Sequence, residues 1–197
     1  MLKNIATRIK AFLKPIWLFV GGFSSNGRTL APIPFNEEQR QRAVVQYGLN
    51  NAEMVEEYQV IVGQAAYACK TPIALVSICD GDRQFFKAGM GLDKDEAPRK
   101  WAFCGHAIAD PYEILEIEDT TLDPRFARNP LVVGPPRIRF YAGVPLISSE
   151  GYPLGTLCVI DQEPKKLTED QRLRLKLLAQ NLIVEILSRN SKSQYPS

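Results

Sequence analysis

A cysteine and the only histidine of the chain lie two positions apart in the segment WAFCGHAI, residues 101–108. Thiolates and imidazoles are common nucleophiles, general bases and metal ligands in proteins. Cys104 and His106 could therefore form a metal site, a nucleophilic pair or an attachment point for a cofactor. The structural alternative is that Phe103 packs beneath a covering segment, while His106 hydrogen-bonds a backbone group or a carboxylate such as Asp119.

Metal binding is the weakest of these alternatives. A zinc site takes three or four ligands, but the chain has a single histidine and no Cys-x-x-Cys pair. We therefore predict no metal ligand and no cofactor. The other three cysteines, Cys69, Cys79 and Cys158, lie in apolar stretches, which is typical of buried thiols in a reducing compartment.

Nucleophilic chemistry at Cys104 stays open. Cys104 comes before a predicted helix start, where the helix dipole would favour the thiolate. Residues two apart do not share a helix face, so a pair with His106 would need a non-helical geometry.

Two arginines and two aromatic residues further along the chain could bind an anion together, because a guanidinium is a fork-shaped anion donor. They are Arg125, Phe126, Arg139 and Tyr141. An ion pair of Arg139 with Asp119 or Asp161 is at least as good an explanation. The candidate ligand-binding residues are thus Phe103, Cys104, His106, Asp119, Arg125, Phe126, Arg139 and Tyr141.

Hydrophobic periodicity predicts the elements that position these residues. We expect helices over 37–47, 52–69, 105–109 and 168–190, a short helical turn over 123–129 closed by Pro130, and strands over 72–79, 84–90, 113–119, 137–147 and 152–161. Thr168 and Gln171 form a predicted capping box. Helices around a sheet with hairpin connections make an α+β domain.

The last predicted helix carries two apolar stripes. Leu175, Leu178, Ala179, Leu182 and Ile186 form one, and Leu173, Leu177, Val184 and Leu187 lie nearly opposite. One stripe suffices to pack a helix on a sheet. We therefore predict a homodimer through helix 168–190, with cover by the chain's own head or first helix as the alternative.

Charge is uneven along the 197 residues, whose net charge is +2. Residues 1–36 hold five basic and no acidic side chains, and residues 37–197 sum to −3. This balance gives no reason to expect nucleic acid as a partner. In residues 1–14 apolar residues recur at helical spacing with basic residues opposite, and Pro15 separates this stretch from an apolar patch, which together predict that residues 1–20 bind an anionic membrane surface. A cleaved transit peptide and a helix docked on the domain are the alternatives.

Several segments, in order, resemble the GAF domain family, in the bacterial branch found ahead of histidine kinases and diguanylate cyclases. They are PIALVSICDGDRQFFKAGMGL (72–92), FCGHAI (103–108), DPRFARNPLV (123–132), IRFYAGVPLI (138–147) and GYPLGTLCVID (151–161). The resemblance implies a central antiparallel sheet with helices on both faces, and a ligand, when there is one, under a cover formed here by residues 101–136.

The same resemblance limits the chemistry. Free methionine-R-sulfoxide reductases, one GAF branch, have a cysteine at a position similar to Cys104, but residues 105–157 lack the second cysteine of that branch. Bilin-binding members often carry adjacent Cys and His residues, but here Gly105 stands between Cys104 and His106, so covalent bilin attachment is not expected. The residue set of the cyclic GMP-binding members does not occur in order in this chain.

We therefore expect a stand-alone GAF sensory module that acts by binding a small ligand or an unknown signalling partner, not an enzyme. The alternative is a thiol-based redox enzyme or sensor that uses Cys104. The expected organisation is a basic segment and linker over 1–35, a GAF domain over 36–190 and a tail over 191–197. The expected location is the cytoplasm, and peripheral attachment to the inner membrane face is a further expectation.

Overall fold

A six-stranded antiparallel sheet forms the centre of the domain. The structure is a computed structural model that describes residues 28–194, with side chains up to residue 190. The strand order is β3-β2-β1-β6-β5-β4. The strands are β1 (Ile73–Asp80), β2 (Arg83–Met90), β3 (Glu96–Pro98), β4 (Leu115–Ile117), β5 (Phe140–Ile147) and β6 (Pro153–Asp161).

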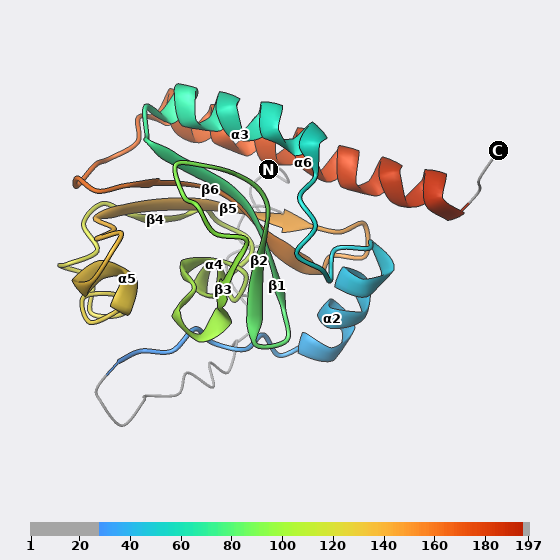
Figure 1. Ribbon diagram of the computed structural model, residues 1–197, viewed down its shortest axis with the longest axis horizontal. Coiled ribbons are helices and arrows are strands. Elements are labelled where there is room, and N and C mark those ends of the chain that lie inside the picture. Colours follow the sequence, from blue (N-terminus) through green and yellow to red (C-terminus); the bar gives the residue numbers. More distant parts are fainter. Residues whose placement is uncertain (1–27, 195–197) are drawn as a thin grey trace, which may run out of the picture.

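Helices cover both faces of this sheet (Figure 1). α3 (Glu56–Cys69) and α6 (Glu169–Gln194) lie side by side along one face, and α2 (Glu37–Gln46) packs at the end of the sheet against β1 and β6. The other face carries α4 (Phe103–Ala107), α5 (Pro130–Val133) and the 3₁₀ turn η1 (Arg99–Trp101). The predicted α+β class and two-sided helical cover are confirmed.

Both faces of the central strands are buried, because each face has its own hydrophobic core. Alternate residues of β1, such as Ala74 and Val76, join the core under α3 and α6. Ile73 and Leu75 join the core on the α4 side. This explains why the strand sequences have no polar face.

The capping box of the last helix is confirmed. The backbone N–H of Gln171 donates to the hydroxyl of Thr168, and the backbone N–H of Thr168 donates to the side-chain oxygen of Gln171. In its first stripe Leu175 and Leu182 are fully buried, whereas Leu173, Leu177 and Val184 of the second stripe are exposed. Residues 28–190 therefore leave most of the second stripe uncovered.

Several predicted bounds were wrong. α3 begins at Glu56 and not at residue 52, because the N–H of Val55 bonds the carbonyl of Lys87 and keeps this stretch extended. Pro130 does not close the turn at 123–129 but opens α5, which Asn129 caps. β3 and η1 were not predicted.

Residues 28–34, expected to be linker, pack on the domain. The N–H of Ala31 donates to the carbonyl of Lys100, and Ala31 is buried. A side chain in place of Gly105 would meet the Cβ of Ala31 at 2.6 Å. The glycine between Cys104 and His106 thus lets this segment, which we call the strap, lie directly on α4.

Candidate functional site

The eight candidate residues do not form one site. Five of them line two hollows on the α4 side of the sheet, separated by an aromatic stack, and Asp119, Phe126 and Arg139 line neither hollow. The rings of Phe103 and Phe126 are parallel, with centroids 4.4 Å apart, and Phe103 also stacks on Tyr141 at 5.1 Å. All three rings are buried.

The inner cavity, of about 130 Å³, lies between the sheet and the segment that carries η1 and α4. Leu75, Phe86, Leu131, Ile138 and Ile160 give it mainly apolar walls. Three candidates line it, namely Phe103, Cys104 and Tyr141, and Trp101, Gln84 and Cys158 were not foreseen as part of it.

Tyr141 gives the inner cavity a buried polar group. Its side chain lies along β5 over Gly143, where an added Cβ would be 2.3 Å from the phenolic oxygen. The hydroxyl makes no hydrogen bond of ordinary geometry with any described residue, although Thr156 is close enough to influence it. Burial raises the pKa of Tyr141 well above its usual value, so the hydroxyl keeps its proton.

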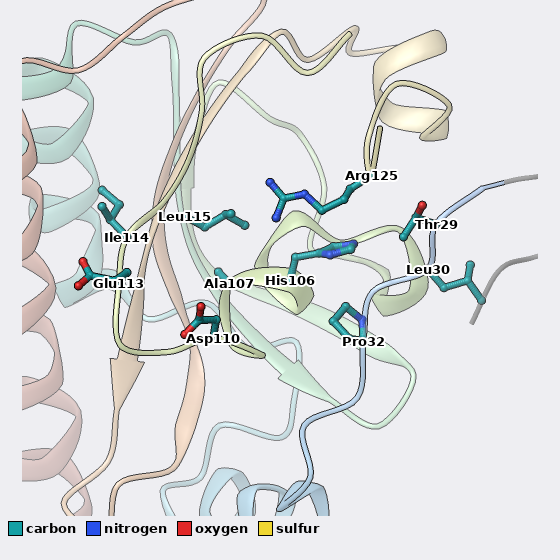
Figure 2. A pocket seen from close by; sticks show the side chains of 10 residues that line it. All are labelled: Thr29, Leu30, Pro32, His106, Ala107, Asp110, Glu113, Ile114, Leu115 and Arg125. Atoms are coloured by element: carbon teal, nitrogen blue, oxygen red, sulfur yellow. The ribbon is translucent and has the colours of Figure 1, made fainter. Parts of the chain in front are cut away.

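The outer pocket, of about 410 Å³, lies between α4, the strap and the segment before β4. Figure 2 shows His106 and Arg125 facing it, with Thr29, Leu30 and Pro32 of the strap forming one wall. Asp110 and Glu113 line it as well. The pocket therefore holds a histidine and charges of both signs.

His106 is held by an aromatic contact and not by a carboxylate. Its ring meets Phe126 edge-on at 4.7 Å, and no hydrogen bond to Asp119 forms. Burial, and then the positive charge of Arg125, lower the pKa of His106 to about 4, against a smaller opposing effect of Asp123. The imidazole is thus neutral at neutral pH.

The predicted convergence of Arg125 and Arg139 on one anion is wrong. Arg125 lies over the ring of Phe126 at 5.1 Å and pairs with Asp123 at 2.6 Å. Arg139 instead donates to the backbone carbonyls of Val132 and Ile138, both at 3.0 Å.

The predicted ion pair of Arg139 with Asp119 or Asp161 is also not formed. Asp119 accepts hydrogen bonds from Thr121 and lies away from both hollows. Asp161 pairs with Lys165 at 2.6 Å. Arg139 is therefore a structural residue that holds the segment before β5.

Cys104 has a partner that the sequence did not indicate. Its Sγ is 3.4 Å from the Sγ of Cys79, at the end of β1, and both thiols are buried. Cys104 lies within α4 and not before it, and burial, followed by the effect of Cys79, raises its pKa. The expected activation by a helix start is therefore wrong. Strand alternation alone places Cys79 on the α4 side, but only the fold brings the two sulfurs together.

Metal coordination finds no support in the described part of the chain. Among residues 28–194 no three histidine, cysteine, aspartate or glutamate side chains are grouped so that they could hold an ion. Within the same range, none of the helices has the length and apolar character needed to cross a membrane.

Comparison with known proteins identifies the family. The sequence model of the GAF domain matches residues 53–186, and the chain belongs to the GAF domain family. GAF folds generally serve regulation, and a signalling role is consistent with this membership. A curated relative, a cyclic di-GMP phosphodiesterase of Pseudomonas aeruginosa, is 49% identical over 134 residues. That match covers 68% of this chain but only 23% of the relative.

Solved structures agree on the fold. A GAF domain of a phosphoenolpyruvate-protein phosphotransferase from Coxiella burnetii has a TM-score of 0.60 at 20% identity, over 81% of this chain and 98% of that one. The free methionine-R-sulfoxide reductase of Neisseria meningitidis, in complex with its substrate, has a TM-score of 0.57 at 18% identity, over 79% and 88% of the two chains. At these identities the likeness concerns the fold alone.

Proposed function

We propose that the protein is a sensory GAF module that binds a small molecule in the inner cavity and passes the signal to a partner. The observation that carries this proposal is the hydroxyl of Tyr141, which is buried beside the cavity and makes no hydrogen bond of ordinary geometry among residues 28–190, although Thr156 and Cys158 lie close to it. An unpaired buried hydroxyl costs about 1–3 kcal/mol. A ligand that accepts its hydrogen bond would remove this cost.

The cavity defines the class of ligand. A dry apolar cavity of about 150 Å³ accommodates a molecule the size of benzene, and the inner cavity has a similar volume of about 130 Å³. The ligand is therefore small and mainly apolar, with one oxygen or nitrogen placed to accept a hydrogen bond from Tyr141. Trp101 and Phe103 offer it aromatic contacts.

Phenol and benzene test this assignment as probes. We expect phenol to raise the thermal midpoint of the full chain more than benzene does. Tyr141→Phe should abolish the difference, because one hydrogen bond contributes about 1 kcal/mol. Native mass spectrometry of freshly purified protein would reveal a natural ligand. If neither probe stabilises the protein and no small molecule is retained, the inner cavity is not a ligand site.

The output is proposed to be regulation within bacterial signalling. A segment that is 49% identical to 134 residues of this chain occurs inside a cyclic di-GMP phosphodiesterase of Pseudomonas aeruginosa. This supports a role for the domain beside such enzymes. Most of that relative lies outside the match, so its activity is not assigned to these residues. Co-purification with a cyclic di-GMP phosphodiesterase, and a change in its rate, would test this role.

A second candidate is a thiol-based redox enzyme at Cys104. The 3.4 Å contact with Cys79 favours it, since it supplies the second cysteine that residues 105–157 lack. The assay is reduction of free methionine-R-sulfoxide with dithiothreitol as the reductant. Turnover that is lost in Cys104→Ser would establish the enzyme, and a wild-type protein without turnover would exclude it.

A further inference from the structure

Two buried thiols from separate parts of the fold form a pair. Cys79 lies one residue before the end of β1 and Cys104 lies in α4, 25 positions later, yet their Sγ atoms are 3.4 Å apart. Either sulfur can donate to the other. Each residue is at most 1% exposed, so water does not stabilise a charge on either one.

Charged side chains stabilise negative charge at this pair. Arg40 is fully buried, and its Nη1 donates to the backbone carbonyl of Cys79 at 2.7 Å. Arg99, 3% exposed, donates to the carbonyl of Gly81 and shares one carboxylate, that of Glu37, with Arg40. Two guanidinium groups and one carboxylate leave a net positive charge near Cys79.

The two thiols consequently differ. A hydrogen bond from Cys104, followed by the charges of Arg99 and Arg40, lowers the pKa of Cys79 despite its burial. The pKa of Cys104 is raised by burial and by Cys79. A thiol of lowered pKa in contact with a second thiol is the arrangement that reacts with oxidants and then closes a disulfide.

A small oxidant can approach the pair from the inner cavity at Cys104. Cys104 forms part of the cavity wall, whereas Cys79 is in contact with Cys104 but does not itself line the cavity. Cys69 offers a contrast, because it lies in the core beneath α3 on the other face, and burial raises its pKa to about 11.

We propose that Cys79 and Cys104 are a redox-active pair that a hydroperoxide oxidises to a disulfide. One sulfur of the pair, once ionised, attacks the peroxide oxygen, and an S–O bond forms as the O–O bond breaks. The departing alkoxide or hydroxide takes a proton from solvent and leaves as alcohol or water. The sulfur of the second residue then attacks the resulting sulfenic acid. The S–S bond forms, the S–O bond breaks, and water leaves with the remaining thiol proton.

The disulfide would join β1 to α4. It would thus fix the segment that carries η1 and α4, which forms one side of the inner cavity, to the sheet. Oxidation would thereby reach the ligand site of the proposed function. The pair itself needs no ligand, so its oxidation and the binding of phenol can fail independently.

Peptide mapping of the full chain tests the proposal. Reduced protein is treated with hydrogen peroxide, free thiols are blocked, and the protein is digested with trypsin. Cys79 and Cys104 fall in tryptic peptides 71–83 and 101–125, which contain no other cysteine. We expect these two peptides to become linked, with the loss of two hydrogens from the intact mass, and dithiothreitol to release them.

Matched variants separate this pair from general oxidation. Cys79→Ser and Cys104→Ser should each abolish the linked peptide, whereas Cys69→Ser should leave it unchanged. The free thiols of Cys79 and Cys104 should be lost at least about tenfold faster than the free thiol of Cys69. A serine variant that misfolds would also lack the linked peptide, so the wild type in urea is a second control, in which the preference for this pair should vanish.

Two outcomes would overturn the proposal. One is native wild-type protein that gives no linked peptide while its thiols are consumed. The other is a bond from Cys104 to Cys158, the third thiol on this side of the sheet.

Discussion

Arg40 and Glu37 lie one turn apart on α2 and form an ion pair in which the arginine is completely buried, with Nη2 2.8 Å from Oε1. Arg99 binds the same carboxylate from η1. The three side chains thus connect α2 with the end of β1 and with the segment that leads into α4. Glu37 is the only acidic partner that the structure gives either arginine among residues 28–190.

Glu37→Gln should destabilise the protein by about 3 kcal/mol, because it leaves two buried guanidinium groups without a counter-charge. Urea denaturation measures the loss. The control is Glu38→Gln, which removes an exposed pair with Arg42 and should cost less than about 1 kcal/mol. Equal effects of the two variants would contradict the importance assigned to the buried network.

The pKa of Glu37 also predicts a loss of stability in acid. Burial alone would raise it, but hydrogen bonds from Arg40 and Arg99 hold it at about 2, against an ordinary 4.5. The folded pKa is depressed, so the stabilisation is complete above pH 4.5 and disappears as the pH falls towards 2. Allowing for partial exposure, we expect about 2 kcal/mol, absent in Glu37→Gln.

His106 should act in a separate and higher pH window. Its pKa in the folded protein is about 4, against 6.5 when exposed, because burial and then Arg125 disfavour the charged form. The unfolded chain binds the proton more readily, so stability is complete above pH 6.5 and falls between pH 6.5 and 4, by about 2–3 kcal/mol.

Because the chain has one histidine, its ring protons can be followed directly by NMR. We expect a midpoint near pH 4 in the folded protein. His106→Gln should remove the fall in stability over this window. A midpoint near 6.5 would mean that the ring is solvated and that the outer pocket is more open than the structure shows.

Gly143→Ala should displace Tyr141, because the new Cβ would lie 2.3 Å from the phenolic oxygen and 2.7 Å from Cζ. Overpacking of this kind costs about 1–3 kcal/mol, and the displaced ring should also weaken phenol binding. Gly63→Ala in α3 is the matched control. A Cβ there meets nothing within 4 Å, so this variant should gain about 0.5–1 kcal/mol.

Residues 1–20 lie outside the described residues, and their membrane binding stays a prediction from the sequence. The full chain should sediment with anionic vesicles at low salt and less at high salt, because each basic residue near the surface contributes about 1 kcal/mol. A chain that lacks residues 1–34 should stay in solution. If both chains bind equally, or neither does, the segment is not a membrane anchor.

The sequence predicted the elements of the fold well where local chemistry decides. Thr168 and Gln171 define a helix start by themselves, and the β-rich, mainly apolar stretch at 72–79 predicted a strand that forms at Ile73–Asp80. Local signals were insufficient where a distant residue decides. The N–H of Val55 donates to the backbone carbonyl of Lys87, which is distant in sequence, and α3 therefore begins later in the chain than the sequence predicted.

The candidate site was predictable as a region and not as an arrangement. Phe103, Cys104 and Tyr141 do share a cavity, but Phe126 separates them from His106 and Arg125. Which side of a buried ring a neighbour occupies depends on packing, and periodicity does not report it. The contact of Cys79 with Cys104 could not be predicted for the same reason, because it joins two segments whose sequence patterns are independent of each other.

α3 lies beside α6 (Figure 1), and both helices expose apolar side chains. Leu173, Leu177 and Val184 of α6 are 57%, 49% and 64% exposed, and Val60 and Tyr67 of α3 are 65% and 88% exposed. Large exposed apolar surface marks interaction sites in soluble proteins. We propose that a second copy of the chain covers it, since the face is formed by two neighbouring helices and can pair with itself about a twofold axis.

Light scattering of the full chain should therefore give a dimer at tens of micromolar. Leu177→Glu should shift it to a monomer, because the carboxylate would be buried without a partner in the dimer. Leu122→Glu is the matched control, since Leu122 is 81% exposed in the turn that follows β4, outside α3 and α6, and should leave the dimer intact. A wild-type monomer at this concentration would refute the dimer. A dimer that withstands Leu177→Glu would place the interface on another surface.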